Sequence, residues 1–393
     1  MENHTTTAEE KVPFWLDPDK RSIIFQILTF LMVGLLAFYL VNNTLTNMEK
    51  QNISSGFDFL GKEASFEVGE SPIEYSAADS YAKALLVGFL NTLKVSFLGI
   101  VLCTIIGVFV GVARLSSNWL VSKMAMAYIE LMQNIPVLLQ LFFWYALFYE
   151  IFPSPRGALN PMAGVFLCNR GTALGVPAAH PANMYILLAL VSGIVISFII
   201  HKWAKKRLFE TGKMFPVFWT SAIIILALPT IVWFLAGTPT KMDLPSLQGF
   251  NFEGGIMLSP EFTALLLGLT IYTSAFVAEA VRAGIQSVTR GQTEAAHSIG
   301  LKSRHVLSLV ILPQAMRVII PPLTSQMLNL TKNSSLAIAI GFPDFVSVAN
   351  TTINQTGQSI EGVALIMGCY LIFSLSTSVF MNWYNKKSQL VER

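Results

Sequence analysis

Hydrophobic residues form long, nearly uninterrupted runs along this chain, and most polar and charged residues lie between the runs. A helix that crosses a bilayer needs about 20 mainly apolar residues. Eight stretches reach or approach that length: 22–42, 95–113, 124–150, 184–201, 217–236, 261–283, 321–341 and 361–383. The pattern predicts an all-α, polytopic membrane protein with about eight transmembrane helices.

Composition supports this class. Hydrophobic residues make up 53% of the chain and charged residues 12%, about half the charged fraction of a soluble protein. The first apolar run follows Lys20 and Arg21, as in a signal peptide. It is longer than the apolar part of a signal peptide, and no small-residue cleavage site follows it. We expect it to remain as a helix.

The distribution of Lys and Arg predicts the orientation, because basic residues are enriched in cytoplasmic loops. Most of the 26 Lys and Arg residues fall in five segments that share one side: 1–21, 114–123, 202–213, 282–317 and 386–393. Both termini are therefore expected inside. The outward segments 43–83, 151–183 and 237–259 are expected to be loops, with an interfacial helix over Ala84–Leu93 before the second span.

The sequence contains no motif for a nucleotide or metal site that could supply energy. No Gly-x-x-x-x-Gly-Lys-Ser/Thr phosphate loop occurs, and the five histidines do not cluster at metal-ligand spacings. We expect no catalytic residue, no metal site and no cofactor bound by this chain. Any energy must come from a partner.

The inward segment 285–320, after the sixth span, carries the most informative pattern. A short helix is expected to begin at Thr293-Glu294-Ala295-Ala296 and to end at Gly300, since glycine is favoured just past a helix C-terminus. Ala295 and Ala296 keep one helix face slim, so that another protein can approach it closely. A second helix over 303–310 is expected to end at Pro313. The plain alternative is an amphipathic connector.

The spacing of these residues resembles the EAA loop of bacterial ABC-importer permeases: Glu-Ala-Ala, a glycine four residues later, and closure at Ile311-Leu312-Pro313. In that family the loop is the coupling helix that docks onto the ATP-binding subunit. The resemblance implies coupling roles for Gly291, Gln292, Glu294, Ala295, Ala296, Gly300 and Pro313.

Further motifs resemble the polar amino-acid (histidine, glutamine or general L-amino-acid) branch of that family. They are Gly88-Phe-Leu-Asn91-Thr92-Leu93, Ile129-Glu130, Asn134-Ile135-Pro136, Gln140, Glu279-x-x-Arg282-x-Gly284, Gly291-Gln292 and Lys332-Asn333-Ser334-Ser335-Leu336. The resemblance covers 84–150 and 260–385. Segment 1–83 adds a span with an outward loop, 151–259 is an insertion with two spans, and 386–393 is a cytoplasmic tail. This layout is similar to Aap/Bzt-type general L-amino-acid permeases.

The resemblance implies a type I ABC-importer permease in the bacterial inner membrane that moves L-amino acids. It implies a second, non-identical permease subunit, two ATP-binding subunits that hold ATP and Mg, and a periplasmic amino-acid-binding protein. Membrane lipid is expected as a partner and nucleic acid is not. An ion-driven secondary transporter would predict inverted repeats, and a sensor or anchor would need a sizeable soluble domain; the sequence shows neither.

Ionisable groups inside a bilayer are costly and mark functional sites. If the seventh span starts near Pro321, Lys332 lies roughly 16 Å along it, near mid-bilayer. The cluster Lys332, Asn333, Ser334 and Ser335 is interpreted as a wall of the substrate path. Alternatively, Lys332 is a strut paired with Glu130 or Glu361.

Gln140 and Ser274 are further candidates for the substrate path, although single polar residues in spans more often join helices. Glu279 and Arg282 are expected to pair on one helix face.

Overall fold

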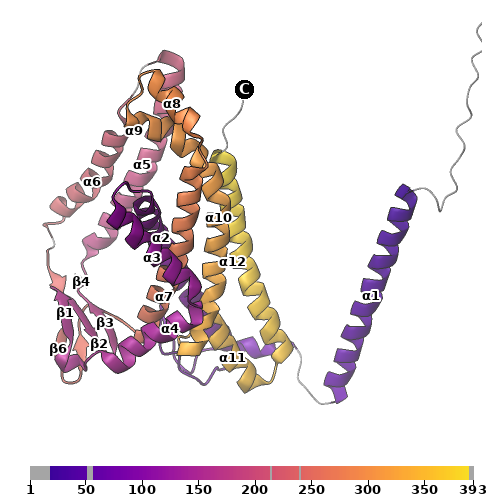
Figure 1. The fold of residues 1–393 in the computed structure, drawn as a ribbon. Helices are drawn as coiled ribbons and strands as arrows, with labels where there is room; N and C mark the ends of the chain where they lie inside the picture. The colour runs from indigo at the N-terminus through magenta and orange to yellow at the C-terminus, as the bar shows by residue number, and fades with distance from the viewer. Residues whose placement is uncertain (1–17, 51–55, 213–214, 239, 389–393) are drawn as a thin grey trace, which may run out of the picture.

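The computed structural model describes residues 18–50, 56–212, 215–238 and 240–388, and helices dominate it (Figure 1). The α-helices are α1 (Pro18–Lys50), α2 (Tyr81–Arg114), α3 (Trp119–Asn134), α4 (Val137–Ala146), α5 (Pro181–Thr211), α6 (Val217–Leu235), α7 (Pro260–Gln286), α8 (Arg290–Ser298), α9 (Ser303–Val306), α10 (Leu312–Asn333), α11 (Phe345–Thr356) and α12 (Ser359–Ser388). Short 3-10 or π-helical segments are η1 (Asp58–Gly61), η2 (Leu147–Ile151), η3 (Pro155–Gly157), η4 (Leu307–Ile311) and η5 (Ser334–Ile340).

Within the described ranges, seven helices are long and apolar enough to cross a membrane, and a bent pair of helices would make eight. The prediction of about eight spans is confirmed, and each predicted span has a helical counterpart in the same order. Three of these counterparts differ from the expected form.

The second span is one helix from Tyr81 to Arg114, so the prediction of a separate interfacial helix over 84–93 is wrong. Its 34 residues make it about 51 Å long. Lys94 lies within this helix, where Glu70 pairs with its ammonium at 2.6 Å and the Phe262 ring lies 4.1 Å away.

The third span is bent by 102° between α3 and α4 instead of being straight. Pro136 is the reason: a proline disfavours helical geometry in the residue before it, and Ile135 is extended. The buried Gln140 bridges the bend, since its Nε2 donates to the carbonyls of Met132 (2.9 Å) and Ile135 (3.0 Å). The bend frees these carbonyls, and the glutamine satisfies them.

The seventh span begins earlier than predicted, because the helical path runs from Ser303 to Ile340. The expectation that Pro313 ends a helix is wrong. Pro313 lies in the first turn of α10, directly after the π-helical turn η4. A proline inside a regular helix clashes with the preceding turn, and a wider π turn gives the ring room. The inward loop is therefore joined to the span without a break.

Helices α2, α7 and α10 form the centre of the bundle. Glycines allow the close approach: a Cβ at Gly107 of α2 would lie 2.5 Å from the Val277 side chain of α7. One at Gly284 of α7 would lie 2.3 Å from the Ile319 side chain of α10. Small residues that bring backbones together are the usual basis of helix packing in membranes.

The two outward loops of the insertion contain short strands that the sequence analysis did not predict. They are β1 (Leu159–Met162), β2 (Val165–Cys168), β3 (Gly171–Leu174), β4 (Val176–Pro177), β5 (Met242–Asp243), β6 (Ser246–Gln248), β7 (Asn251–Glu253) and β8 (Ile256–Leu258). One antiparallel sheet has the order β1-β2-β3-β8, and two further pairs are β4-β5 and β6-β7. Because β3 precedes the α5–α6 hairpin and β8 follows it, the sheet closes the outer end of the insertion.

Figure 1 shows that α8 and α9 lie at one end of the bundle, and the strands, α4 and α11 at the other. Helix α1 stands apart, and none of the residues in its most apolar window is buried. Its apolar surface is thus left for lipid or another protein chain. The inward and outward ends expected from the charge pattern therefore correspond to opposite ends of the fold.

Candidate coupling and translocation surfaces

Helix α8 matches the predicted short helix closely at its end and less well at its start. It begins at Arg290, three residues before the expected Thr293. Gly300 ends it with φ +82°: its N–H bonds to the carbonyl of His297, and the N–H of Leu301 bonds to that of Ala296. This pair of bonds is the Schellman motif, which requires a left-handed residue and so favours glycine.

The two alanines of the Glu-Ala-Ala triplet lie on different sides of α8. Glu294 and Ala295 are exposed, together with Gly291, whereas Ala296 is buried against its own chain. The prediction that both alanines form the slim outer face is therefore wrong for Ala296. A helix repeat of 3.6 residues places adjacent residues about 100° apart, which separates them.

Ile299 is a candidate docking residue that the sequence analysis missed. Its side chain is 78% exposed at the tip of α8, next to Glu294 and Ala295 on the helix surface. A large apolar side chain this exposed at an inward tip, outside the spans, suits a protein contact. Its position just before the terminal glycine was the available signal.

Helix α8 is fastened to the seventh span. The Gln292 and Gln314 side chains hydrogen-bond to each other, and Gln314 Nε2 also donates to the Val310 carbonyl at 2.9 Å. Gln292, expected to couple, thus links α8 to α10 through its side chain.

The cluster at 332–335 is divided by the end of α10. Lys332 is exposed and forms no ion pair within the described residues, while Asn333 and Ser335 are half-buried. Ser334 is fully buried, and its hydroxyl donates to the Thr331 carbonyl at 2.7 Å. Lys332 therefore has no strut partner here; Glu361 instead accepts a bond from the Gly56 N–H at 2.7 Å.

Lys332 also lies farther along its helix than predicted. The path begins at Ser303, so Lys332 is about 44 Å from the start and only eight residues from Ile340. It lies near the outer end of this helical path. With Ser325 and Asn329, which are also exposed, it forms a polar stripe on one face of α10, since residues four and three apart share a face.

Gln140 and Ser274 are both buried in the bundle. Gln140 supports the α3–α4 bend, and its Oε1 has no partner. The Ser274 hydroxyl donates to the Ile271 carbonyl at 2.9 Å and lies 2.6 Å from the Tyr128 hydroxyl. Both therefore join helices in this state, as the simpler sequence interpretation held.

A polar cavity of about 320 Å³ lies where the inner ends of α2 and α7 meet the second half of α3. Arg114, Glu130, Gln133, Glu279 and Arg282 line it. Arg282 Nε donates to Glu279 at 2.9 Å, which confirms the expected pair. Charges of both signs thus face the cavity close to the inward side.

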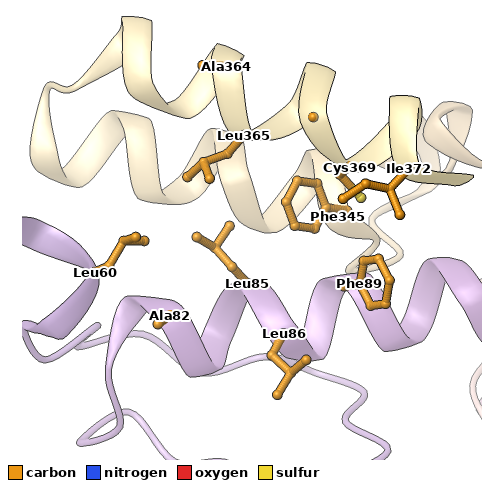
Figure 2. A pocket seen from close by; sticks show the side chains of 11 residues that line it. Leu60, Ala82, Leu85, Leu86, Phe89, Phe345, Ala364, Leu365, Cys369 and Ile372 are labelled. Carbon is orange, nitrogen blue, oxygen red and sulfur yellow. The ribbon is translucent and has the colours of Figure 1, made fainter. Parts of the chain in front are cut away.

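A second cavity, of about 410 Å³, lies between α2 and α12 (Figure 2). Figure 2 shows that its lining side chains, such as Leu85, Phe89 and Leu365, carry no nitrogen or oxygen. A site for a small polar molecule needs a few placed polar groups. This cavity therefore does not suit an amino acid.

A buried polar network fixes the outer end between η5 and α11. Asn91 Nδ2 donates to the Pro343 carbonyl at 2.9 Å, and the Thr92 hydroxyl accepts the Phe345 N–H at 3.0 Å. Asp344, fully buried, caps α11 by accepting the Ser347 N–H at 2.9 Å, and the Tyr370 hydroxyl donates to it at 3.3 Å. Burial raises the pKa of the Asp344 carboxyl to about 6, although these hydrogen bonds oppose the shift.

No group of three or more metal-ligating side chains occurs among the residues that the structure describes. The arrangement is that of a membrane transport subunit: a bundle of spans with an exposed inward helix fastened to a span that carries a polar stripe.

Comparison with known proteins identifies the family. Residues 185–389 match the family described as binding-protein-dependent transport system inner membrane component. The chain belongs to this family and is a multi-pass inner-membrane protein of a multi-subunit transport system. Nothing in the comparisons supports an ion-driven secondary transporter.

Three similar proteins match over nearly their full length. The general L-amino acid transport system permease protein AapQ of Rhizobium johnstonii is 48% identical over 96% of this chain and 94% of its own. The putative amino-acid ABC transporter permease protein YhdX of Escherichia coli is 45% identical over 100% of both chains. The glutamate/glutamine/aspartate/asparagine transport system permease protein BztB of Rhodobacter capsulatus is 40% identical over 95% of both.

Proposed function

We propose that this chain is the permease subunit of a bacterial ABC importer that moves L-amino acids of broad range. The observation that carries the proposal is the continuous helical path from Ser303 to Ile340. It links the exposed surface of α8 at one end to the polar stripe Ser325, Asn329 and Lys332 near the other. The relatives named for amino-acid transport support the substrate class.

In this proposal ATP and Mg are bound by two partner ATP-binding subunits, and this chain has no ATPase site. A second, non-identical permease and a periplasmic binding protein complete the system. The partner ATPase contacts Gly291, Glu294, Ala295 and Ile299 on α8, and Gly300 sets the angle of the helix end. Gln292 and the turn at Pro313 pass displacement of α8 into α10. Nucleotide drives transport because the partner binds differently to the inward-open and outward-open states.

The chemistry of the stripe suits the groups that all amino acids share. The Lys332 ammonium attracts an α-carboxylate, and the neutral Asn329, Asn333 and Ser335 offer hydrogen bonds without demanding one side-chain charge. An unpaired carboxylate or ammonium moved out of water would cost several kcal/mol. A path that holds these two groups and leaves the side chain loose would accept many amino acids. The fully buried Ser334 has no direct part in this proposal.

The coupling half is tested with Ile299→Asp and Glu294→Lys in the complete complex reconstituted in liposomes. Both changes alter the docking surface without touching the spans, so we expect ATP-driven uptake to fall at least tenfold while the permease still reaches the membrane. Ser117→Asp, which places a charge at an exposed position in the inward turn between α2 and α3, is the matched control and should transport nearly normally. Normal uptake by Ile299→Asp and Glu294→Lys in an assembled complex would reject the coupling surface.

The substrate half is tested with Lys332→Met. Uptake of several amino acids should fall by similar factors, because the change removes a ligand of the shared carboxylate and leaves no buried partner charge. Ser334→Ala is the control, since its hydroxyl is fully buried away from the exposed stripe, and uptake should stay within about twofold. A Lys332→Met complex that transports normally would remove the stripe from the path.

A further inference from the structure

Two of the four charged side chains that line the polar cavity between α2, α3 and α7 have no charged partner. Glu279 and Arg282 balance each other, because Arg282 Nε donates to the Glu279 carboxylate at 2.9 Å. The Arg114 guanidinium donates to a neutral group, the Ser122 hydroxyl, at 3.0 Å. Among the residues that the structure describes, neither Arg114 nor Glu130 forms an ion pair. The cavity is therefore lined by one unpaired cation and one unpaired anion.

These two unpaired groups lie close together along α3. Ser122, Met126 and Glu130 are four residues apart, so they share one face of this helix. The Arg114 guanidinium contacts both Ser122 and the Met126 sulfur, the latter at 3.2 Å. Glu130 lies one helical turn, about 5.4 Å, beyond Met126. Because Arg114 and Glu130 line the same cavity, a small molecule inside it can contact both.

The size and the charge of the cavity suit one small zwitterion. Its volume of about 320 Å³ is near the lower end of the range for small-molecule sites, roughly 300 to 1,000 Å³. Two arginines and two glutamates line it, so their formal charges sum to zero. A simple anion or a simple cation would leave Glu130 or Arg114 without a partner. Met126 and Ile129 add apolar lining, against which a side chain can lie.

We propose that this cavity is a second amino-acid site, on the inward side, in which Arg114 binds the α-carboxylate and Glu130 binds the α-ammonium. The inference rests on the substrate class in the proposed function. The site is separate from the polar stripe of α10 and holds an amino acid between that stripe and the cytoplasm. An ionised residue within a span is costly unless it has such a role. An ethanolamine phospholipid headgroup carries the same two charges, and the experiment distinguishes it from a free amino acid.

The test is alkylation of a cysteine placed in the cavity. The complete complex carrying Met126→Cys is reconstituted without ATP in phosphatidylglycerol nanodiscs, and labelling of position 126 by N-ethylmaleimide is followed by peptide mass spectrometry. L-Glutamine should slow the labelling at least fivefold. Ile129→Cys serves if the first variant does not assemble. Ser117→Cys, in the exposed inward turn, is the control and should be labelled at the same rate with or without glutamine.

Two glutamine derivatives identify the groups that are bound. N-Acetyl-L-glutamine lacks the ammonium and L-glutaminamide lacks the carboxylate, so each should need at least a tenfold higher concentration for half-protection, as expected for the loss of a hydrogen bond to a charged group. Glu130→Gln should raise the half-protecting concentration of L-glutamine by a similar factor and leave that of N-acetyl-L-glutamine nearly unchanged. Glu253→Gln, an exposed carboxylate in β7, should change neither.

Absence of protection by L-glutamine, or equal protection by its N-acetyl derivative, would overturn the site. Protection that disappears with Lys332→Met would also overturn it, because the cavity would then only report occupancy of the stripe. If phosphatidylethanolamine nanodiscs protect the cysteine and L-glutamine in phosphatidylglycerol does not, the occupant is a lipid and the assignment to an amino acid is wrong. ATP-driven uptake, which tests the proposed function, is not part of this readout, so the two can fail separately.

Discussion

Asp344 is a buried carboxylate whose replacement should stabilise the protein. It lies beyond the outer end of the seventh span, fully buried, and burial raises its pKa to about 6. Asparagine has nearly the same shape. Its Oδ1 can accept the Ser347 N–H, and its amide can donate to the Tyr370 hydroxyl that now donates to the aspartate. Asp344→Asn therefore removes the charge and keeps both hydrogen bonds.

The stability that the Asp344 charge costs follows from the difference between the pKa in the folded chain, about 6, and the ordinary value of 3.8. A raised carboxyl pKa means that folding favours the protonated form, so stability is greatest below pH 3.8 and is lost as the pH rises through 6. At pH 7.5 the loss is about 3 kcal/mol, because each pKa unit corresponds to 1.36 kcal/mol. At pH 5 it is only about half as large.

The assay is the apparent melting temperature of the detergent-purified permease complex at pH 5 and pH 7.5. Asp344→Asn should melt about 3 to 4 °C higher than wild type at pH 7.5, given the unfolding entropy of a chain of this length. The advantage should shrink at pH 5. Asp344→Ala should gain much less, because it also loses a helix cap worth about 1 kcal/mol and removes the hydrogen bond between Asp344 and the Tyr370 hydroxyl.

Asp79→Asn supplies a control of opposite sign. A hydrogen bond from Lys83 lowers the pKa of the Asp79 carboxyl, so its ionised form favours folding at neutral pH. This variant should not melt higher than wild type. A lower melting temperature for Asp344→Asn at pH 7.5, or a gain as large at pH 5, would refute the reasoning from the buried charge.

Two packing predictions follow from the same structure. Gln140→Leu leaves the carbonyls of Met132 and Ile135 unpaired at a cost of about 1 to 3 kcal/mol each, so the melting temperature should fall. Leu139→Ala on the exposed surface should change the melting temperature little. Equal melting temperatures for the two variants would contradict the role of Gln140 in supporting the α3–α4 bend. Gly107→Val places a side chain within 2.5 Å of Val277 and should prevent assembly of the complex, measured by size-exclusion chromatography. Gly34→Val in α1 meets nothing within 4 Å and should assemble. Normal assembly of Gly107→Val would contradict the close packing of α2 and α7.

The sequence by itself determined the class of protein and the number and order of the spans. Apolar length is a local property, and the bilayer requires each spanning segment to satisfy its own backbone hydrogen bonds, so a run such as 217–236 can be assigned without its neighbours. The end of α8 was equally local, because the Schellman motif at Gly300 involves residues within one turn.

Only the tertiary structure decided how these helices bend and which residues share a surface. The effect of a proline depends on its surroundings: Pro136 accompanies a bend that Gln140 supports, whereas Pro313 follows a π turn and leaves the helix continuous. The short strands of the insertion have two to four residues, too few for a periodic signal, and β3 and β8 are joined only because α5 and α6 fold back. Lys332 and Ser334 are two residues apart, yet one is exposed and the other fully buried. Burial is set by the helices packed around each side chain, and the local sequence does not contain those contacts.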